Sequence, residues 1–295
     1  MLVKEFSVVI PTLGGEALKR TINLINSGSL VPNEVLVCIP KEFTSRVNGL
    51  SAFQNVKILG TECKGQVAQR IEGFKQVTND YVIQLDDDMY VYETCFERLI
   101  EGLTNFKEEV AIAPAMIFDT TEQSCYQFEY RDSKIRSFIE GKNWFQPGNI
   151  TRSGWNLGLN ALLSSERFCS VEWLPGGCVA HKKKNLILDN FYPFKGKAFF
   201  EDVIQSVHLT NNEVRLLIDN KALCGIDEYE VSLPSLLSDA KNFNKYYRYR
   251  KHIVRLRRES IVYLLLDGLY SYLLTVKTLI NLLLKPAKVT ESKAV

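Results

Sequence analysis

The fold is decided by the stretch Tyr81-Val82-Ile83-Gln84-Leu85-Asp86-Asp87-Asp88. A short apolar run bounded by acids predicts a buried β-strand that delivers carboxylates to the edge of a sheet. Three adjacent carboxylates repel one another, and each resists ionisation without a counter-charge. A hard divalent cation such as Mg²⁺ or Mn²⁺ is one such counter-charge, and a solvated acidic turn is the alternative.

Strands and helices alternate on both sides of this stretch. The pattern predicts strands at 6–10, 34–39, 56–59, 81–85 and 110–113, and helices at 16–26, 66–76 and 93–105. This alternation indicates an α/β fold, with a mostly parallel, Rossmann-like sheet flanked by helices. Ligands of such sheets bind beyond the carboxyl ends of the strands, where the loop after the first strand and the aspartates should meet.

The periodicity weakens after the fifth strand, and the C-terminal part has a different character. Residues 118–165 are rich in Gly, Asn, Ser and aromatic residues, which indicates a substrate-binding insertion. The sequence therefore predicts a catalytic domain over 1–238 and a basic, amphipathic helical segment over 239–295. A Leu-rich helix at 253–284, entered through basic and aromatic residues, suits an anionic membrane surface. Packing on the catalytic domain or in a homodimer is the alternative.

Composition limits the classes of protein to consider. The chain has 295 residues, a formal net charge of +2, seven cysteines and three histidines. The cysteines form no CxxC pair, which argues against a structural zinc module, and their odd number argues against a disulfide framework and favours the reducing cytoplasm. No stretch of 18 uncharged apolar residues predicts a spanning helix, so the expected location is peripheral, on the inner face of the cell membrane. No nucleic-acid partner is expected.

Three further segments carry residues suited to chemistry. The segment from Lys64 to Gly73 opens a helix with a glycine-bearing loop, which offers backbone N–H groups to phosphate oxygens. Arg70 in this segment is expected either to contact a pyrophosphate or a base carbonyl or to form a surface ion pair. Trp173-Leu174-Pro175-Gly176-Gly177 ends in two glycines, which permit close approach of a ligand or serve a tight turn. Glu201-Asp202 begins a helix, where Asp202 is either a general base or a helix cap.

Taken in order, these segments resemble the inverting family 2 glycosyltransferases, which have the nucleotide-sugar-binding GT-A fold. The resemblance covers residues 6–223. Five segments carry it: Val8 to Thr12 resembles the opening strand and donor loop, Gly65 to Gly73 the G-Q-x-x-Q-R-N-x-G stretch, Asp86 to Asp88 the metal-binding D-x-D, Trp173 to Gly177 the W-L-P-G-G loop, and Glu201-Asp202 the E-D motif.

Applied residue by residue, the resemblance implies a role for each position. The donor side would comprise Pro11, Thr12, Leu13, Gly65, Arg70, Asp86 and Asp87, the last in a structural role. Asp88 would bind Mg²⁺ or Mn²⁺ directly, with Asp86 facing the metal and the nucleotide. The acceptor-side loop would comprise Trp173, Gly176, Gly177 and Glu201. Asp202 would deprotonate an acceptor hydroxyl, which attacks the anomeric carbon opposite the leaving diphosphate.

Three positions depart from the family pattern. Ile39-Pro40-Lys41 stands where many relatives carry an acid that grips the base and ribose, and Ile71 replaces the usual Asn. The late metal-binding His is absent, and Asp227 is the candidate oxygen ligand in its place.

The resemblance implies transfer of a sugar from a UDP- or dTDP-linked donor to a glycan or lipid-linked acceptor, in bacterial surface-polysaccharide synthesis. A non-catalytic scaffold subunit is one alternative. A sugar nucleotidyltransferase is the other. It would need a Gly-rich loop with a catalytic Lys or Arg close to the first strand, and the loop Leu13-Gly14-Gly15 has no such basic residue before Lys19.

Overall fold

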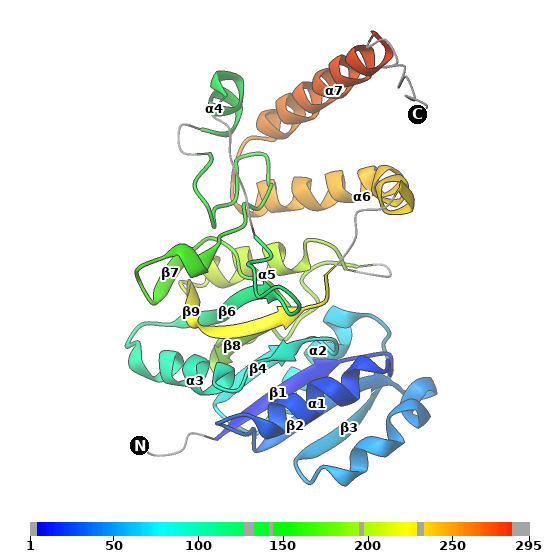
Figure 1. The fold of residues 1–295 in the computed structure, drawn as a ribbon, viewed down its shortest axis with the longest axis vertical. Coiled ribbons are helices and arrows are strands. Elements are labelled where there is room, and N and C mark those ends of the chain that lie inside the picture. The colour runs from blue at the N-terminus through cyan, green and yellow to red at the C-terminus, as the bar shows by residue number, and fades with distance from the viewer. Residues whose placement is uncertain (1–4, 127–132, 142–143, 195–197, 229–232, 285–295) are drawn as a thin grey trace, which may run out of the picture.

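The core of the protein is a nine-stranded sheet with helices on both faces (Figure 1). The structure is a computed structural model that describes residues 5–126, 133–141, 144–194, 198–228 and 233–284. Eight strands run in the order β3-β2-β1-β4-β8-β6-β9-β5, and β7 pairs with β9 beside this path. The strands are β1 (Phe6–Pro11), β2 (Glu34–Pro40), β3 (Val56–Thr61), β4 (Tyr81–Leu85), β5 (Tyr90–Val91), β6 (Val110–Phe118), β7 (Phe168–Val171), β8 (Cys178–Lys182) and β9 (Arg215–Ile226).

The first four strands of the order are parallel, and the remainder of the sheet is mixed. β1 pairs in parallel with β2 and with β4, and β2 pairs in parallel with β3. β8 then runs antiparallel to β4 and to β6, whereas β6 and β9 are parallel. The predicted α/β class and flanked sheet are confirmed. The strand predicted at 110–113 was too short, because β6 continues past a register shift at Pro114 and Ala115.

The helices cover both faces of the sheet, as the alternation of side chains along β1 requires. Val8 and Ile10 pack with the apolar faces of α1 and α3, whereas Val9 packs with Phe74 of α2 on the opposite face. Burial on both faces explains why β1 and β2 are predominantly apolar. The helices are α1 (Ala17–Ser27), α2 (Gln66–Phe74), α3 (Cys95–Asn105), α4 (Lys134–Glu140), α5 (Glu201–Asn211), α6 (Leu233–Leu256) and α7 (Ile261–Leu284), with 3-10 turns η1 (Lys41–Ala52), η2 (Ala161–Leu163) and η3 (Lys183–Asn185).

A glycine brings α2 unusually close to the sheet. A Cβ atom on Gly73 would lie 2.5 Å from Val9 Cγ1 and 2.5 Å from Cys38 Sγ. Any larger residue would therefore push α2, together with the site residues on it, away from β1 and β2.

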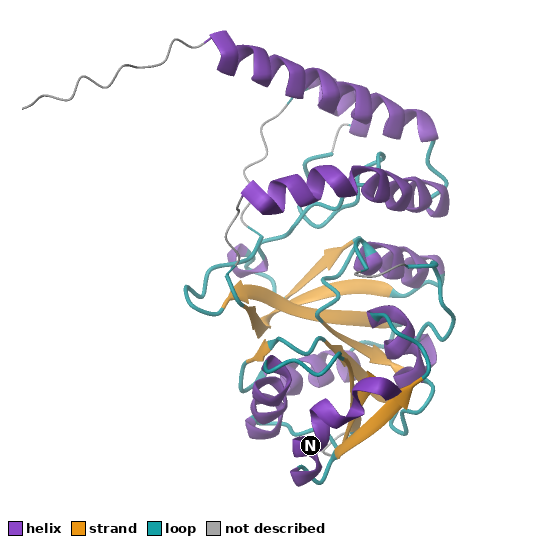
Figure 2. Ribbon diagram, turned by 90° about the vertical axis from the view of Figure 1, so that its right-hand side faces the viewer, coloured by secondary structure: helices purple, strands orange, loops and turns teal. Residues whose placement is uncertain are grey.

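The C-terminal region consists of two helices where the sequence predicted one helix at 253–284. α6 ends at Leu256, and α7 begins at Ile261. Arg258 adopts a left-handed conformation (φ 58°), and the Glu259 N–H donates to the Val254 carbonyl, which closes α6 as a Schellman-type end does. Figures 1 and 2 show α6 between α7 and the sheet-bearing part of the molecule. The part of the predicted segment at 285–295 lies outside the described residues.

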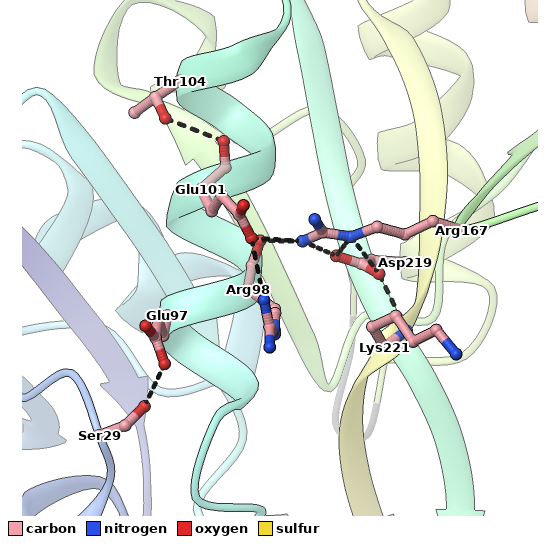
Figure 3. Close-up of polar contacts among 8 residues, drawn as sticks. All are labelled: Ser29, Glu97, Arg98, Glu101, Thr104, Arg167, Asp219 and Lys221. Carbon is pink, nitrogen blue, oxygen red and sulfur yellow. Dashed lines mark hydrogen bonds and ion pairs between the residues drawn. The ribbon is translucent and has the colours of Figure 1, made fainter. Parts of the chain in front are cut away.

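An ion-pair network fastens the irregular half of the sheet (Figure 3). Arg167 binds the fully buried Asp219 of β9 and also Glu101 of α3, with N···O distances of 2.9 Å for both. Asp219 lies where the pairing of β6 with β9 shifts, and it also accepts a bond from the Lys221 N–H. The network therefore compensates for backbone bonds that the bulge interrupts.

Candidate active site

The loops after β1 and β4, with the start of α2, line a pocket of about 730 Å³. Its lining comprises Pro11, Thr12, Leu13, Gly15, Lys64, Gly65, Gln66, Gln69, Asp86, Asp87 and Asp88. The pocket lies at the carboxyl ends of parallel strands, as the sequence predicted, and its volume suits a nucleotide-sized ligand. Of the predicted donor-side residues, Arg70 alone is not among the lining residues.

Hydrogen bonds fix the floor of this pocket. The Thr12 hydroxyl donates to Asp87 and accepts from the Gly14 N–H at 2.9 Å. Buried Gln69 donates to the carbonyls of Thr12 and Cys38, at 2.7 and 2.8 Å, and accepts from the Gly65 N–H. Gly65 adopts φ 133°, which a side chain would strain. Asp87 is thus committed to the loop, consistent with its predicted structural role.

Arg70 lies below the pocket and joins two carboxylates. Its Nη1 donates to both carboxylate oxygens of Glu201 at 3.0 Å, and its Nη2 donates to Asp86 Oδ1 at 3.0 Å. The Arg70 side chain is 3% exposed. Burial lowers the pKa of Arg70, but Glu201 and Asp86 together raise it more, so the guanidinium stays charged. Contact of Arg70 with a phosphate stays a prediction, whereas its bridging of Asp86 to Glu201 is what the structure shows.

Asp86 and Asp88 face different surroundings although they are two residues apart. Asp86 Oδ1 also accepts from Gln66 Nε2 at 2.7 Å, and burial raises the pKa of Asp86 to about 6 against the opposing effect of Arg70. Asp88 is exposed, and no side-chain hydrogen bond to its carboxylate occurs among the described residues. Asp88 is therefore the carboxylate that is available to a ligand in the pocket.

The double glycine after Trp173 fits between the two acidic segments. A Cβ atom on Gly176 would lie 3.1 Å from Asp202 Cβ and 3.1 Å from Glu201 Oε1. A Cβ atom on Gly177 would lie 3.1 Å from Met89 Sδ, and the Gly177 carbonyl accepts from the Asp86 N–H at 2.8 Å. The loop thus brings the triple aspartate and the Glu201-Asp202 pair together because neither glycine carries a side chain.

Asp202, the predicted general base, is a carboxyl group with a raised pKa. It begins α5, its Oδ1 accepts from the Val203 N–H at 2.9 Å, and burial together with Glu201 raises its pKa to about 7. A carboxyl group that titrates near neutral pH can accept a proton with useful efficiency. The preceding residue but one, Phe200, has φ 56°, an uncommon conformation for a bulky side chain that is found at functional sites.

Two predicted site residues lie elsewhere. Trp173 is 4% exposed, and its Nε1 donates to the Leu157 carbonyl at 2.9 Å, so it supports the 173–177 loop from within the core. Asp227 accepts from the Tyr90 hydroxyl at 2.7 Å and lies 3.9 Å from Arg20. Within the described ranges, no group of three His, Cys, Asp or Glu residues is placed to hold a metal ion. A metal contact of Asp227 stays a prediction.

Several functional positions had not been singled out from the sequence. Gln66 and Gln69 belong to the quoted glycine-bearing stretch, but their roles follow only from the hydrogen bonds to Asp86 and Thr12. Gln84 is a polar residue inside the apolar strand β4, which was the available signal. Its amide donates to the Gly176 carbonyl at 2.8 Å and accepts from Gln205 of α5.

Comparison with known proteins agrees with this geometry. A sequence model described as glycosyl transferase family 2 matches residues 7–163, which include the pocket-lining segments. The chain belongs to this family. A search of curated proteins found no match. Within the described residues, no helix has the length and apolar character needed to cross a membrane.

Solved structures share the GT-A-like fold with this family 2 chain. A crystal structure of GalNAc-T7 with UDP, GalNAc and Mn²⁺ has a TM-score of 0.56 and 14% identity, over 78% of this chain and 44% of the other. A structure of S. aureus TarS 1-349 with UDP-GlcNAc has a TM-score of 0.50 and 15% identity, over 78% and 60% of the two chains. The chain thus spans less than two thirds of the length of these solved structures.

Proposed function

We propose that this chain is a metal-dependent, inverting glycosyltransferase that moves a sugar from a nucleotide diphosphate donor to a glycan or lipid-linked acceptor. One observation carries the proposal. Arg70 and the Gly176-Gly177 turn connect the donor pocket to the Glu201-Asp202 pair. UDP in one similar structure and UDP-GlcNAc in another support a UDP-sugar donor, with a dTDP-sugar as the alternative. Synthesis of a surface polysaccharide is the proposed setting.

The residues of the pocket fit a divalent cation that is shared with a diphosphate. Asp88 offers an exposed carboxylate, and Asp86 uses only Oδ1 for its hydrogen bonds to described side chains. Mg²⁺ and Mn²⁺ prefer such oxygen ligands and take their remaining ligands from water and phosphate. When bound, the ion would neutralise charge that develops on the leaving diphosphate. Asp227 remains a proposed third ligand.

The chain's own residues then account for the acceptor half of the reaction. Asp202 takes the proton from the attacking hydroxyl, and both carboxylate oxygens of Glu201 accept from Arg70 Nη1. Arg70 fixes Glu201 relative to Asp86, so the base and the donor side keep one spacing. Gly176 leaves room for the acceptor oxygen to approach Asp202.

The proposal is tested by release of nucleotide diphosphate from a panel of UDP-, GDP- and dTDP-sugars with Mn²⁺. Asp88→Ala and Asp202→Asn should each reduce release by at least about a hundredfold. Asp80→Asn is the matched control, because Asp80 is an exposed carboxylate next to the opposite end of β4. Release that survives both site substitutions would refute the proposal. No release from any donor, with no metal-dependent nucleotide binding, would favour the scaffold alternative.

We also propose that α7 holds the protein on an anionic membrane surface at the cytoplasmic face. Apolar side chains recur along one side of α7 and are exposed at Val262, Leu265, Leu269, Tyr272 and Leu273. Arg248, Arg255 and Arg258 are exposed on α6 and the turn after it. An apolar helix face with adjoining basic residues suits an interface of lipid headgroups and acyl chains.

Vesicles of phosphatidylcholine with about 30% phosphatidylglycerol should test this contact, because their anionic surface attracts basic residues. Binding should weaken when salt screens the basic residues and should be lost in Leu265→Glu/Leu269→Glu. Leu163→Glu is the control, since Leu163 is exposed on η2. A stable dimer in solution that the double variant separates, without binding to vesicles, would instead assign this face to a homodimer.

A further inference from the structure

Aromatic rings from three segments pack around Phe200, which directly precedes the Glu201-Asp202 pair. They have no role in the donor site. Trp155 and Phe200 lie with ring centroids 5.8 Å apart, and Phe200 and Tyr246 lie 6.0 Å apart. The three rings come from the 118–165 insertion, the loop before α5, and α6. Phe200 and Asp202 are two residues apart, so their Cα atoms lie within about 7 Å of each other.

Trp155 is held rigidly although it is partly exposed. Its Nε1 donates to Asp267 Oδ2 at 3.1 Å, and the Arg250 guanidinium lies 4.2 Å from the centre of its ring. Arg250 in turn donates to Asp267 at 2.7 Å and to the Ser153 carbonyl at 3.0 Å. The residue nevertheless remains 37% exposed. A fixed indole with a free surface is unusual for a core residue and typical of a binding surface.

The charges beneath the indole are already neutralised. Arg250 is 6% exposed and Asp267 is 2% exposed, and they pair with each other across α6 and α7. Arg136 adds a second cation at 3.5 Å from Asp267, and buried Glu140, which interacts electrostatically with Arg250, is the second acid of the group. The network thus holds the ring in place without presenting a strong free charge to a ligand, which favours an uncharged, amphipathic ligand with an apolar face.

The backbone conformation of Phe200, two residues before Asp202, is also unusual. Phe200 has φ 56° and ψ 16°, and its carbonyl accepts from the Ile204 N–H at 3.0 Å as α5 begins. Non-glycine residues seldom adopt this conformation unless the surrounding structure holds them in it. It places an aromatic side chain, rather than a glycine, at the entry to the catalytic helix.

From these observations we infer that Trp155 and Phe200 form the acceptor-sugar platform. The C–H face of a neutral pyranose packs on the two rings, and one of its hydroxyl groups is directed to Asp202. This inference rests on the proposed glycosyl transfer and adds the class of acceptor group and the residues that select it. The Arg250–Asp267 pair is then a positioning element, which links α6 and α7 to the orientation of the platform.

Saturation-transfer difference NMR tests the platform with cellotriose, maltotriose and chitotriose at 10 mM (an excess over the millimolar Kd expected of a weak sugar site). Stacking uses the C–H face that all three share, so at least one should show transfer to its ring protons. Trp155→Ala should weaken that binding about tenfold, whereas Trp155→Phe should retain most of it. Phe138→Ala is the control, because Phe138 is an aromatic residue on α4 that is 75% exposed.

The outcomes separate the platform from the proposed reaction. Absence of transfer to all three sugars, or equal binding by wild type and Trp155→Ala, would overturn the platform. If nucleotide release still depends on Asp88 in that case, the proposed reaction stands without it. Trp155-dependent sugar binding with no nucleotide release from any donor would support the platform and refute the reaction. Trp155→Phe controls for a folding defect in Trp155→Ala, because it keeps an aromatic ring in the same place.

Discussion

Two arginines in this protein each join two carboxylates, one pair in the site and one in the scaffold. Arg70 bridges Glu201 and Asp86 below the donor pocket, with N···O distances of 3.0 Å. Arg167 bridges Asp219 and Glu101 at the bulge between β6 and β9, with distances of 2.9 Å (Figure 3). The chemical groups are the same, but their surroundings differ.

The surroundings give the acids opposite properties. Hydrogen bonding to Arg167 lowers the pKa of Glu101, so that carboxylate is stabilised in its charged form. Burial raises the pKa of Asp86 and of Asp202, so ionisation of these two carboxyl groups is less favourable than in water. A structural ion pair is free to adopt its most stable arrangement. A catalytic group that must accept a proton instead needs a pKa near neutral pH. The Arg70 network is therefore expected to affect catalysis, and the Arg167 network stability alone.

The largest difference is expected from Arg70→Met and Arg167→Met. Arg70→Met leaves Glu201 and Asp86 without their shared counter-charge, and it should lower the free energy of unfolding by about 3–5 kcal/mol. It should also reduce turnover about a hundredfold, since the spacing between donor and base is lost. Arg167→Met should destabilise by roughly 3 kcal/mol and leave the turnover of folded protein unchanged. Urea unfolding and nucleotide release measure the two effects.

A second pair of variants distinguishes an effect on catalysis from an effect on folding. Arg70→Lys keeps the charge but has one ammonium nitrogen in place of the two guanidinium nitrogens that reach Glu201 and Asp86 separately, so it should recover stability more than turnover. Arg167→Lys should recover stability with no change in turnover. Equal recovery of both quantities in Arg70→Lys would show that Arg70 serves the scaffold only.

Much of the donor half could be predicted from the sequence because its signals are local. The runs that became β1, β2 and β4 are predominantly apolar, and each ends in a polar or acidic loop at the same edge of the sheet. Pro11, Thr12, Leu13, Gly65 and the three aspartates accordingly line one pocket. Periodicity and strand order suffice for such a result.

The remainder depends on contacts between residues that are distant in sequence. Arg70 could not be assigned to Glu201 because 131 residues separate them, and the sequence suggested a phosphate contact instead. Trp173 lies in a motif, yet only its burial and its bond to Leu157 show that it supports the loop from within. The break between α6 and α7 was missed because Arg258, rather than a glycine, adopts the left-handed turn.

A smaller effect is expected from pH, and it should have opposite signs in the two networks. Asp202 must be ionised to act as a base, so turnover should rise about tenfold per pH unit below 7 and level off above it. A carboxyl whose pKa is raised by folding stabilises the protein fully below its ordinary pKa of 3.8, and this contribution is lost as pH rises through 7. Glu101, whose pKa is lowered, contributes above its ordinary pKa of 4.5 and loses that contribution as pH falls.

Urea unfolding of wild type, Asp202→Asn and Glu101→Gln from pH 3 to 8 (a range that spans both ordinary carboxyl pKa values) measures these signs. Asp202→Asn should become more stable relative to wild type as the pH rises toward 8. Glu101→Gln should approach wild type as the pH falls below 4. A pH–rate profile that is flat between 5 and 8 would contradict the role of Asp202 as the base.

The smallest effect is expected from Glu101→Gln at neutral pH. The Glu101 side chain is 23% exposed, and Arg167 keeps its contact with buried Asp219 after the substitution. The free energy of unfolding should therefore fall by only about 1 kcal/mol, as for a solvent-accessible ion pair. Glu201→Gln is the matched change in the site, where the side chain is 8% exposed and Arg70 loses half of its counter-charge. Equal loss of stability in both variants, with full turnover in both, would show that the two arginine networks are equivalent. Arg70 would then have a structural role only.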